Sequence, residues 1–271
     1  MAAVTAAVLL TSGCSMAQFK RGYLPEESVG ATDHTDRIMT LWNGSWAAGL
    51  IVGVITWALI IWCVVVYRRR KGETGMPVQL RYNMPIETFY IVVPVLMVMV
   101  LFFFTVRDQE AIQKPNDPTV VIEAVGKQWA WDFNYVTDNV YYAGVQTNLD
   151  GTEEPGKNSP VLYLPEGERI EMKLRSRDVI HSFWIPAFLQ KRDMIPGRES
   201  SIYFEPQKEG TYVGKCAELC GEYHSEMLFN VKVVPKSEYD AYIQKLKAEG
   251  NVGQLGPEYD RNPGQEEKVG S

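Results

Sequence analysis

The sequence predicts an α+β membrane protein, in which a two-helix transmembrane hairpin precedes an extracytoplasmic domain made only of β-strands. Two almost wholly apolar runs, 46–67 and 86–106, each approach the roughly 20 residues that cross a bilayer as a helix. Four basic residues, 68–71, directly follow the first run. From Thr119 onward, short β-forming runs alternate with Gly- and Pro-containing turns, as in a β-sandwich or barrel.

Composition narrows the class of protein. A length of 271 residues suits one or two domains. The 33 acidic residues outnumber the 27 Lys and Arg, which argues against a nucleic-acid partner and is compatible with a basic protein partner. Four cysteines without framework spacing exclude a disulfide-rich scaffold.

The N-terminus reads as an export leader. Residues 1–14 are a short apolar run that ends in small residues and a cysteine, like the end of a bacterial lipoprotein signal, so Cys14 is the expected lipidation site. No Lys or Arg precedes Lys20, which leaves an ordinary signal peptide and an unprocessed apolar terminus open. Residues 15–45 are expected to be an extracytoplasmic, largely polar surface segment, with His34 solvated or packed rather than bound to metal.

The two apolar runs are expected to form a hairpin. Residues 46–67 make the first helix, and the basic run behind them places the 68–85 loop in the cytoplasm. Residues 86–106 then return the chain to the outside. A buried hairpin of a soluble protein is the alternative, which the length of both runs and the charges between them disfavour. Cys63 is expected to pack within the membrane, and three aromatic residues suit its interfaces: Trp46, Trp62 and Tyr67.

Glu87 is an ionisable residue at the start of the second run. Such a group is a candidate for function by default. The alternative is a carboxylate that caps the helix N-terminus at the level of the lipid headgroups.

Residues 118–235 are predicted to form the β-domain, and 236–271 a C-terminal helix and tail. The helix is amphipathic, with Tyr239, Ile243 and Leu246 on one face. The tail from Asn251 is expected to be mobile or covered by a partner. The predicted strands are Thr119–Val125, Gln128–Tyr135, Pro160–Leu164, Arg169–Leu174, Ser201–Phe204, Thr211–Lys215 and Met227–Val234.

One loop gathers soft metal ligands. Cys216, Cys220, His224 and Met227 lie within twelve residues, and thiolate, imidazole and thioether groups together suit copper. Two thiolates are one too many for a single-copper site but can bridge two copper ions. That arrangement needs a second histidine, and His181, in a short β-type run, is the candidate. A disulfide or redox pair with ordinary packing residues around it is the alternative.

The pattern C-x-E-x-C-G-x-x-H-x-x-M at 216–227 resembles the binuclear copper (CuA) loop of cytochrome c oxidase subunit II. The resemblance implies a cupredoxin-like Greek-key domain that holds two copper ions. It implies that Glu218 contributes its backbone carbonyl, while its side chain helps to hold a magnesium ion shared with subunit I. The implied ligands are Cys216 and Cys220 as bridges, His181 and His224 on one copper each, and Met227 and Glu218 as weak ligands.

Two further segments are similar to that family. Residues 126–131, G-K-Q-W-A-W, resemble its G-H-Q-W-x-W, which implies that Trp129 is the electron entry point, with core packing as the alternative. Residues 87–94 resemble its E-T-x-W-T-x-x-P, which implies that Glu87 lies at the mouth of a proton pathway into subunit I. Lys127 and Tyr90 depart from the family pattern.

The resemblance implies an electron relay in the bacterial plasma membrane. The chain would pass electrons from a cytochrome c to a haem of subunit I, where oxygen is reduced to water with proton pumping, so no catalytic residue lies in this chain. Subunits I and III and membrane lipid are the implied partners. The chain has no C-x-x-C-H motif, so the donor is expected to be a separate cytochrome c or a cytochrome domain of a bc complex.

Three other functions stay open. A quinol oxidase subunit II would lack the copper ligands, a membrane-anchored copper carrier would need exposed ligands, and nitrous oxide reductase has a similar loop on a much larger chain. The long polar loop at 136–160 is expected either to contact the donor or a neighbouring subunit, or to be an insertion without a role.

Overall fold

The computed structural model describes residues 15–72, 74–76, 79–115, 117–147 and 158–261. The predicted leader with Cys14, and residues 148–157 of the predicted loop, lie outside these residues. The chain divides into a helical unit, Arg37–Ala111, and a second unit that combines the residues up to Asp36 with those from Ile112 onward.

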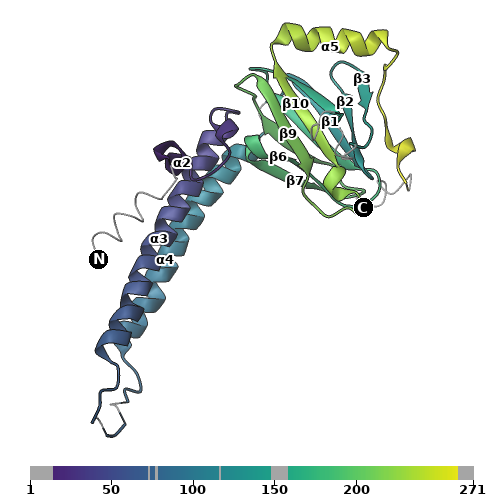
Figure 1. Cartoon of the computed structure of the whole chain (residues 1–271). Helices are drawn as coiled ribbons and strands as arrows, with labels where there is room; N and C mark the ends of the chain where they lie inside the picture. Colours follow the sequence, from purple (N-terminus) through teal and green to yellow (C-terminus); the bar gives the residue numbers. More distant parts are fainter. Residues whose placement is uncertain (1–14, 73, 77–78, 116, 148–157, 262–271) are drawn as a thin grey trace. The chain divides into compact units, whose positions relative to one another are not determined.

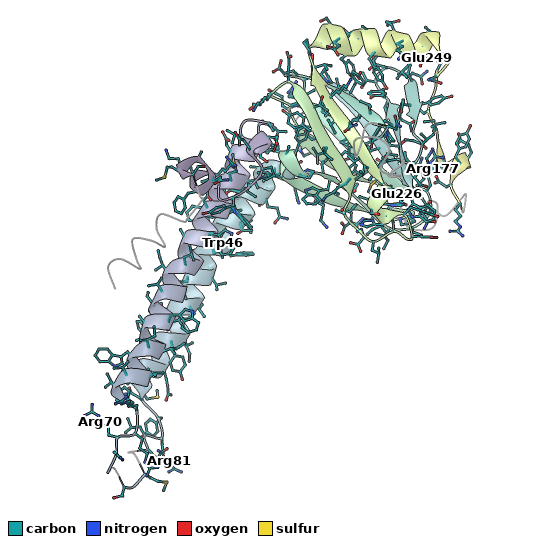
Figure 2. All side chains as sticks on the ribbon, in the orientation of Figure 1. Trp46, Arg70, Arg81, Arg177, Glu226 and Glu249 are labelled. Atoms are coloured by element: carbon teal, nitrogen blue, oxygen red, sulfur yellow. The ribbon has the colours of Figure 1, made fainter. Side chains whose placement is uncertain are left out.

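Two long helices dominate the helical unit. Helix α3 spans Thr35–Val66 and α4 spans Met84–Gln113, and both are long and apolar enough to cross a membrane. Their apolar side chains are exposed all round, as expected of helices whose solvent is lipid. Helix α3 begins before the predicted start at Trp46, because the stretch between holds no proline and Asp36 favours the first turn. Figure 2 shows Arg70 and Arg81 at the end where the helices are connected, away from Trp46.

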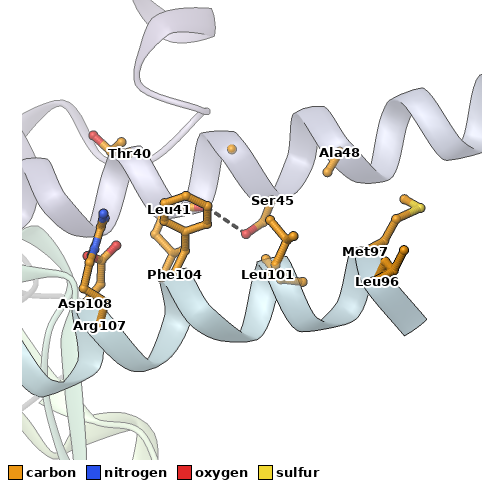
Figure 3. Close-up of a pocket in the computed structure, with 12 residues that line it drawn as sticks. Thr40, Leu41, Ser45, Ala48, Leu96, Met97, Leu101, Phe104, Arg107 and Asp108 are labelled. Carbon is orange, nitrogen blue, oxygen red and sulfur yellow. Dashed lines mark hydrogen bonds and ion pairs between the residues drawn. The ribbon is translucent and has the colours of Figure 1, made fainter. Parts of the chain in front are cut away.

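A groove of about 600 Å³ lies between α3 and α4 within this unit (Figure 3). Small residues of α3, Gly44 and Ala48 among them, leave the space. The Ser45 hydroxyl offers no free donor to the groove, because its Oγ donates to the Leu41 carbonyl oxygen at 2.7 Å. At one end of the groove, Asp108 accepts from Arg37 of α3 at 3.0 Å and from Arg107 of α4 at 2.8 Å. The negative charge of this carboxylate is therefore balanced by arginines of the same two helices.

The β-domain consists of two five-stranded sheets (Figure 1). The first contains β3 (Val140–Ala143), β2 (Ala130–Tyr135), β1 (Val120–Lys127), β5 (Ile170–Ser176) and β8 (Ser200–Phe204), in that spatial order. The second contains β4 (Val161–Pro165), β10 (Leu228–Val234), β9 (Gly210–Cys216), β6 (His181–Ile185) and β7 (Gln190–Met194). Neighbours are antiparallel except β1 with β5 and β4 with β10. The predicted fold class, a helix pair followed by a β-sandwich, is confirmed.

Three strands are absent from the predicted list, although one of them, β6, coincides with the short β-type run noted around His181. Strand β7 was missed, and β3 lies inside the stretch predicted as one long loop, so that prediction is wrong for Val140–Ala143. The sequence did carry a signal for β3, because Val140, Tyr141 and Tyr142 are residues that favour strands, and they pair with β2. The remaining elements are the short helix α2 (Met16–Lys20) and the 3₁₀ turns η1 (Glu26–Ser28), η2 (Pro186–Phe188), η3 (His224–Glu226) and η4 (Pro257–Tyr259).

Aromatic side chains fill the space between the sheets. Trp131 and Phe133 of β2 meet Phe183 of β6 and Phe229 of β10, and all four are fully buried. Gly214 of β9 lies against this cluster, where a Cβ would stand 2.1 Å from the Phe229 ring. A residue without a side chain is therefore required there for the two strands to pack.

Segments near both termini of the described chain contribute buried residues. Near the N-terminus, Ala31 and Thr32 are buried, and the Asp33 amide donates to the Glu205 carbonyl at 3.1 Å, so this part of the predicted surface segment packs on the β-domain. The predicted buried face of the C-terminal helix is confirmed: α5 (Lys236–Ala248) buries Tyr239, Ile243 and Leu246.

Beyond α5, residues 251–261, which we name the C-terminal strap, run back along the first sheet. The Tyr141 amide donates to the Asn251 carbonyl at 3.1 Å, and the Gly253 amide donates to the Asn139 carbonyl at 2.9 Å. The expectation of a mobile tail is therefore wrong for the strap, whereas its covering by a partner stays a prediction and residues 262–271 lie outside the described residues. The strap's polar composition concealed these contacts, because they are made mainly by backbone groups.

Candidate metal centre

The candidate ligands come from two strands of the second sheet. Cys216 ends β9, and the loop that follows carries Cys220 and His224 before Met227 leads into β10. Strand β6 lies beside β9, with Phe183 opposite Cys216. This pairing brings the start of β6, and with it His181, next to a loop that is distant in the sequence.

The donor atoms converge on the two thiols. Cys216 Sγ lies 3.9 Å from Cys220 Sγ, 3.8 Å from His181 Nδ1 and 3.2 Å from the Glu218 carbonyl oxygen. Cys220 Sγ lies 3.4 Å from His224 Nδ1 and 3.7 Å from Met227 Sδ. The structure thus brings all six sequence-predicted donors together, and each thiol has one imidazole and one weaker donor beside it.

Most of the cluster is shielded from solvent, while His224 is half-buried. His181 and Met227 are fully buried and both thiols are 4% exposed, whereas the Glu218 side chain points outward and is exposed. Ligands buried to this degree are held by the fold. They contrast with the exposed, exchangeable ligands that a copper carrier needs.

The two thiols differ in acidity. Burial works to raise the pKa of Cys216, but contact with His181 and backbone hydrogen bonds outweigh it and lower the pKa. Burial, followed by the neighbouring Cys216, raises the pKa of Cys220 to about 12. Both sulfurs can be thiolates together only when positive charge lies beside them, which bound metal ions supply. Two thiols, two imidazoles, a thioether and a carbonyl form a donor set that fits copper.

A second set of residues orients the ligands, and sequence reasoning did not identify it. Asp178 Oδ1 lies 2.8 Å from His181 Nε2, so Nε2 carries the proton and Nδ1 is free to face Cys216. Gln128 holds both Asp178 and the ligand loop. Its backbone N–H donates to Asp178 Oδ2 at 2.7 Å, and its side-chain Nε2 donates to the Cys220 carbonyl at 2.8 Å. The only available signal for Asp178 was its position three residues before His181.

Trp129 lies directly against the ligand loop. Its ring is half-buried and meets the Tyr223 ring edge-on at a centroid distance of 4.9 Å. Gly221 allows this contact, since it has a φ of 133° and a Cβ there would stand 3.0 Å from Trp129 Nε1. Within the described part of the chain, Trp129 Nε1 has no hydrogen-bond partner. The indole is thus half-buried and packs against Gly221 and Tyr223 of the ligand loop.

The other candidate residues contribute no donor atom to the cluster, and Glu87 and Cys63 belong to the helical unit. Glu87 is in the first turn of α4, where its Oε1 accepts from the Asn83 amide at 2.9 Å, as the helix-capping interpretation expects. Cys63 is an exposed thiol on α3. His34 Nε2 lies 3.5 Å from Asp33, in line with its predicted packing role.

Comparison with known proteins assigns the family. The family described as "Cytochrome C oxidase subunit II, periplasmic domain" matches residues 120–234. "Probable cytochrome c oxidase subunit 2" of Streptomyces coelicolor is 41% identical over 93% of this chain and 88% of its own length. "Cytochrome c oxidase subunit 2" of Mycobacterium bovis is 37% identical over 90% of this chain and 80% of its own length.

Among solved structures, the periplasmic domain of subunit II of cytochrome oxidase from Bradyrhizobium japonicum covers 50% of this chain with 97% of its own, at 30% identity and a TM-score of 0.46. The two membrane-length helices and the periplasmic-domain match together fit a membrane protein with an extracytoplasmic β-domain. This chain belongs to the cytochrome c oxidase subunit II family.

Proposed function

We propose that this chain carries the binuclear copper (CuA) centre of a cytochrome c oxidase and relays single electrons from a cytochrome c to a haem of subunit I. Oxygen reduction to water and the proton pumping coupled to it then take place mainly in subunit I. The observation that carries the proposal is the convergence of four further donors on a pair of thiols 3.9 Å apart. A disulfide or a packing cluster requires no second imidazole, thioether or carbonyl at that place.

The proposed ligand roles agree with which donor stands beside which thiol. Cys216 and Cys220 would hold both copper ions, His181 and His224 would hold one each, and Met227 Sδ and the Glu218 carbonyl would be weak ligands. When bound, the copper pair supplies storage of one electron shared between two ions. The protein holds the donors still, because Asp178 fixes His181, Gln128 fixes the Cys220 backbone, and Trp131 Nε1 donates to the Met227 carbonyl at 3.3 Å. A frame that moves little keeps the cost of each charge change low.

Trp129 is the proposed entry point for electrons, since its ring contacts the ligand loop and is only half-buried. Gln146, within the 136–160 stretch, contacts the ligand loop, because its Nε2 donates to Glu226 Oε2 of η3 at 2.6 Å. This contact favours a role for the loop in docking the donor, which is a separate cytochrome c or a cytochrome domain of a bc complex.

The assembly proposed around the chain has several parts. Helices α3 and α4 lie in the bacterial plasma membrane, in contact with lipid and with subunits I and III. The exposed Glu218 side chain is free to share a magnesium ion with subunit I. Cys14 is the proposed lipidation site. A copper carrier is the second candidate, and the deep burial of His181 and Met227 disfavours it.

The test is copper stoichiometry with electron paramagnetic resonance. The purified full-length chain, reconstituted with copper, should bind two copper ions that share one unpaired electron. One copper per chain, or none, would refute the relay and favour a carrier or a redox-thiol protein.

Met227→Leu tests the proposed weak ligand. Leucine nearly conserves the volume of this buried side chain, so the fold should be retained. Two copper ions should remain bound, while the reduction potential and the hyperfine pattern change, because axial ligands tune both. Loss of all copper from this variant would show that the thioether is a principal ligand instead.

Glu87→Gln separates the two interpretations of Glu87. A glutamine amide oxygen can still accept from the Asn83 amide, so the helix start should persist, but the side chain can no longer carry a proton. We expect oxidase turnover to fall several-fold while the rate of electron entry into the copper centre is unchanged. Turnover equal to that of the wild type in a stopped-flow and oxygen-uptake comparison would leave Glu87 as a cap only.

A further inference from the structure

The C-terminal strap (residues 251–261) connects the far end of the β-domain with the copper end. Figure 2 shows Glu249, at the end of α5, at the opposite end of the domain from Arg177 and Glu226. Between these ends, the strap is tied to strand β2: the Leu255 amide donates to Asn134 Oδ1 at 2.9 Å, and Asn134 Nδ2 donates to the Leu255 carbonyl at 3.2 Å. The strap thus has a defined path along the first sheet.

A buried charge network anchors the end of the strap. Both carboxylate oxygens of Asp260 accept from Arg175 Nη1, at 2.6 and 2.7 Å, and Arg175 Nη2 donates to the Leu255 carbonyl at 3.2 Å. Arg175 Nε also pairs with Glu123 at 3.1 Å, and the Arg175 side chain is only 4% exposed. This charge-assisted contact, in which both carboxylate oxygens share one nitrogen, is largely desolvated and holds the strap to β5 more firmly than a surface ion pair would.

The strap contacts the crossover between β5 and β6, residues 177–180, at Arg177. The Arg261 amide donates to the Arg177 carbonyl at 2.9 Å, and the Tyr259 ring lies 5.3 Å from Arg177 Cζ. On the other side, the Arg177 amide donates to the Gly126 carbonyl at 2.9 Å and Arg177 Nη2 pairs with Asp132 at 3.0 Å. Arg177 is therefore held between the strap and strands β1 and β2.

The next residue in the crossover is Asp178, whose carboxylate holds His181 Nε2. The position of the Arg177 backbone sets that of Asp178, and Asp178 sets the rotation of the His181 ring about its Cβ. Leu255 and Tyr259 of the strap line one open pocket of about 620 Å³ together with Asp178, and the strap's hydrogen bond to the crossover is made at Arg177.

We propose that the C-terminal strap is a positioning element for the copper centre, which fixes the orientation of the His181 ligand through Arg177 and Asp178. This inference rests on the proposed CuA function. Without the strap, the crossover moves more and the His181 ring samples a wider range of angles. Copper still binds, but its spectrum broadens, its potential shifts, and its affinity falls toward the roughly 10- to 100-fold loss that removal of an outer-shell contact causes.

The experiment uses the full-length chain with three changes to the strap: truncation after Gly250, Asp260→Asn and Tyr259→Ala. Tyr259→Phe keeps the ring over Arg177 and should restore the wild-type result. Asp240→Asn is the matched control, because Asp240 pairs with Lys236 on the exposed face of α5 and does not touch the crossover. Asp178→Asn gives the full effect of losing the carboxylate on His181.

Four quantities are measured well below the unfolding temperature. They are amide exchange at residues 177–181 in the metal-free chain, copper per chain, the paramagnetic resonance spectrum and the copper reduction potential. We expect faster exchange, a broadened hyperfine pattern and a shifted potential in the three strap variants, and no change in Asp240→Asn or Tyr259→Phe. A purely structural strap would lower the unfolding temperature without altering the spectrum or the potential.

The outcomes separate the two proposals. If the wild type lacks a copper pair, the proposed function fails. If the wild type holds the pair and the strap variants have the same spectrum, potential and exchange, only the positioning role fails. Should the truncated chain not fold, the comparison of Tyr259→Ala with Tyr259→Phe decides, because each changes one side chain that is 60% exposed.

Discussion

Replacing Cys220 by serine is expected to remove the copper pair and, with it, nearly all electron delivery to the oxidase. A hydroxyl is a harder donor and is far less acidic than a thiol, so it cannot bridge two copper ions at neutral pH. The raised pKa of the Cys220 thiol shows how far even the native side chain depends on bound cations to ionise. Copper per chain should fall to one or less, and the shared-electron signal should disappear.

A matched control comes from the same chain. Cys63→Ser exchanges the same atoms at an exposed position on α3, outside the metal centre, and should keep two copper ions and full turnover. Copper analysis, resonance spectra and oxygen uptake with reduced cytochrome c measure both variants. A Cys220→Ser chain that still showed one electron shared by two coppers would refute the bridging role of this residue.

Replacing Arg175 by methionine should have the largest effect on stability. The substitution leaves Glu123 and Asp260 close together and largely buried, with side chains 13% and 10% exposed, and without their common cation. Loss of one partner from a buried ion pair costs about 3–5 kcal/mol in free energy of unfolding. For a domain of this size that corresponds to a fall in Tm of about 6–20 °C. Thermal unfolding, followed by near-ultraviolet circular dichroism of the full-length chain, measures it.

Lys173→Met is the control for this prediction, since Lys173 lies on the same strand and pairs with Glu199 at 3.2 Å near the surface. An exposed pair of this kind contributes about 0–1 kcal/mol, so the unfolding temperature should hardly change. Equal effects of the two substitutions would mean that solvent reaches Arg175 freely and that the strap is not anchored by a buried charge.

Chemistry that lies within one stretch of sequence could be predicted. A soft-metal site is indicated by the close spacing of four soft ligands in one loop, because this combination is uncommon in ordinary packing: Cys216, Cys220, His224 and Met227. His181 could be added by need, as the only histidine in a β-type run. The membrane helices followed from length and hydropathy alone, because lipid imposes the same apolar requirement at every position.

Contacts between distant segments could not be predicted in the same way. Asp178 and Gln128 are ordinary polar residues until β1 and the β5–β6 crossover lie side by side. The sequence predicts a mobile or partner-covered tail where the strap lies, because backbone groups make most of the strap's hydrogen bonds and these have no signature in the side-chain pattern. The early start of helix α3 was missed for a related reason. The residues from Thr35 to Trp46 are compatible with a helix, but hydropathy marks only the apolar part of it.

The parallel pairing of β4 with β10 joins the segments of the second sheet that lie furthest apart in the sequence. Asn230 can meet Val161 only after most of the domain has been delivered across the membrane, and pairings of such long range make folding slow, on the order of milliseconds to seconds. The pairing of β6 with β9, which brings His181 beside Cys216, joins segments that are nearer in the sequence and needs no contact with β4. The ligand cluster therefore does not depend on the last strand pairing of this sheet.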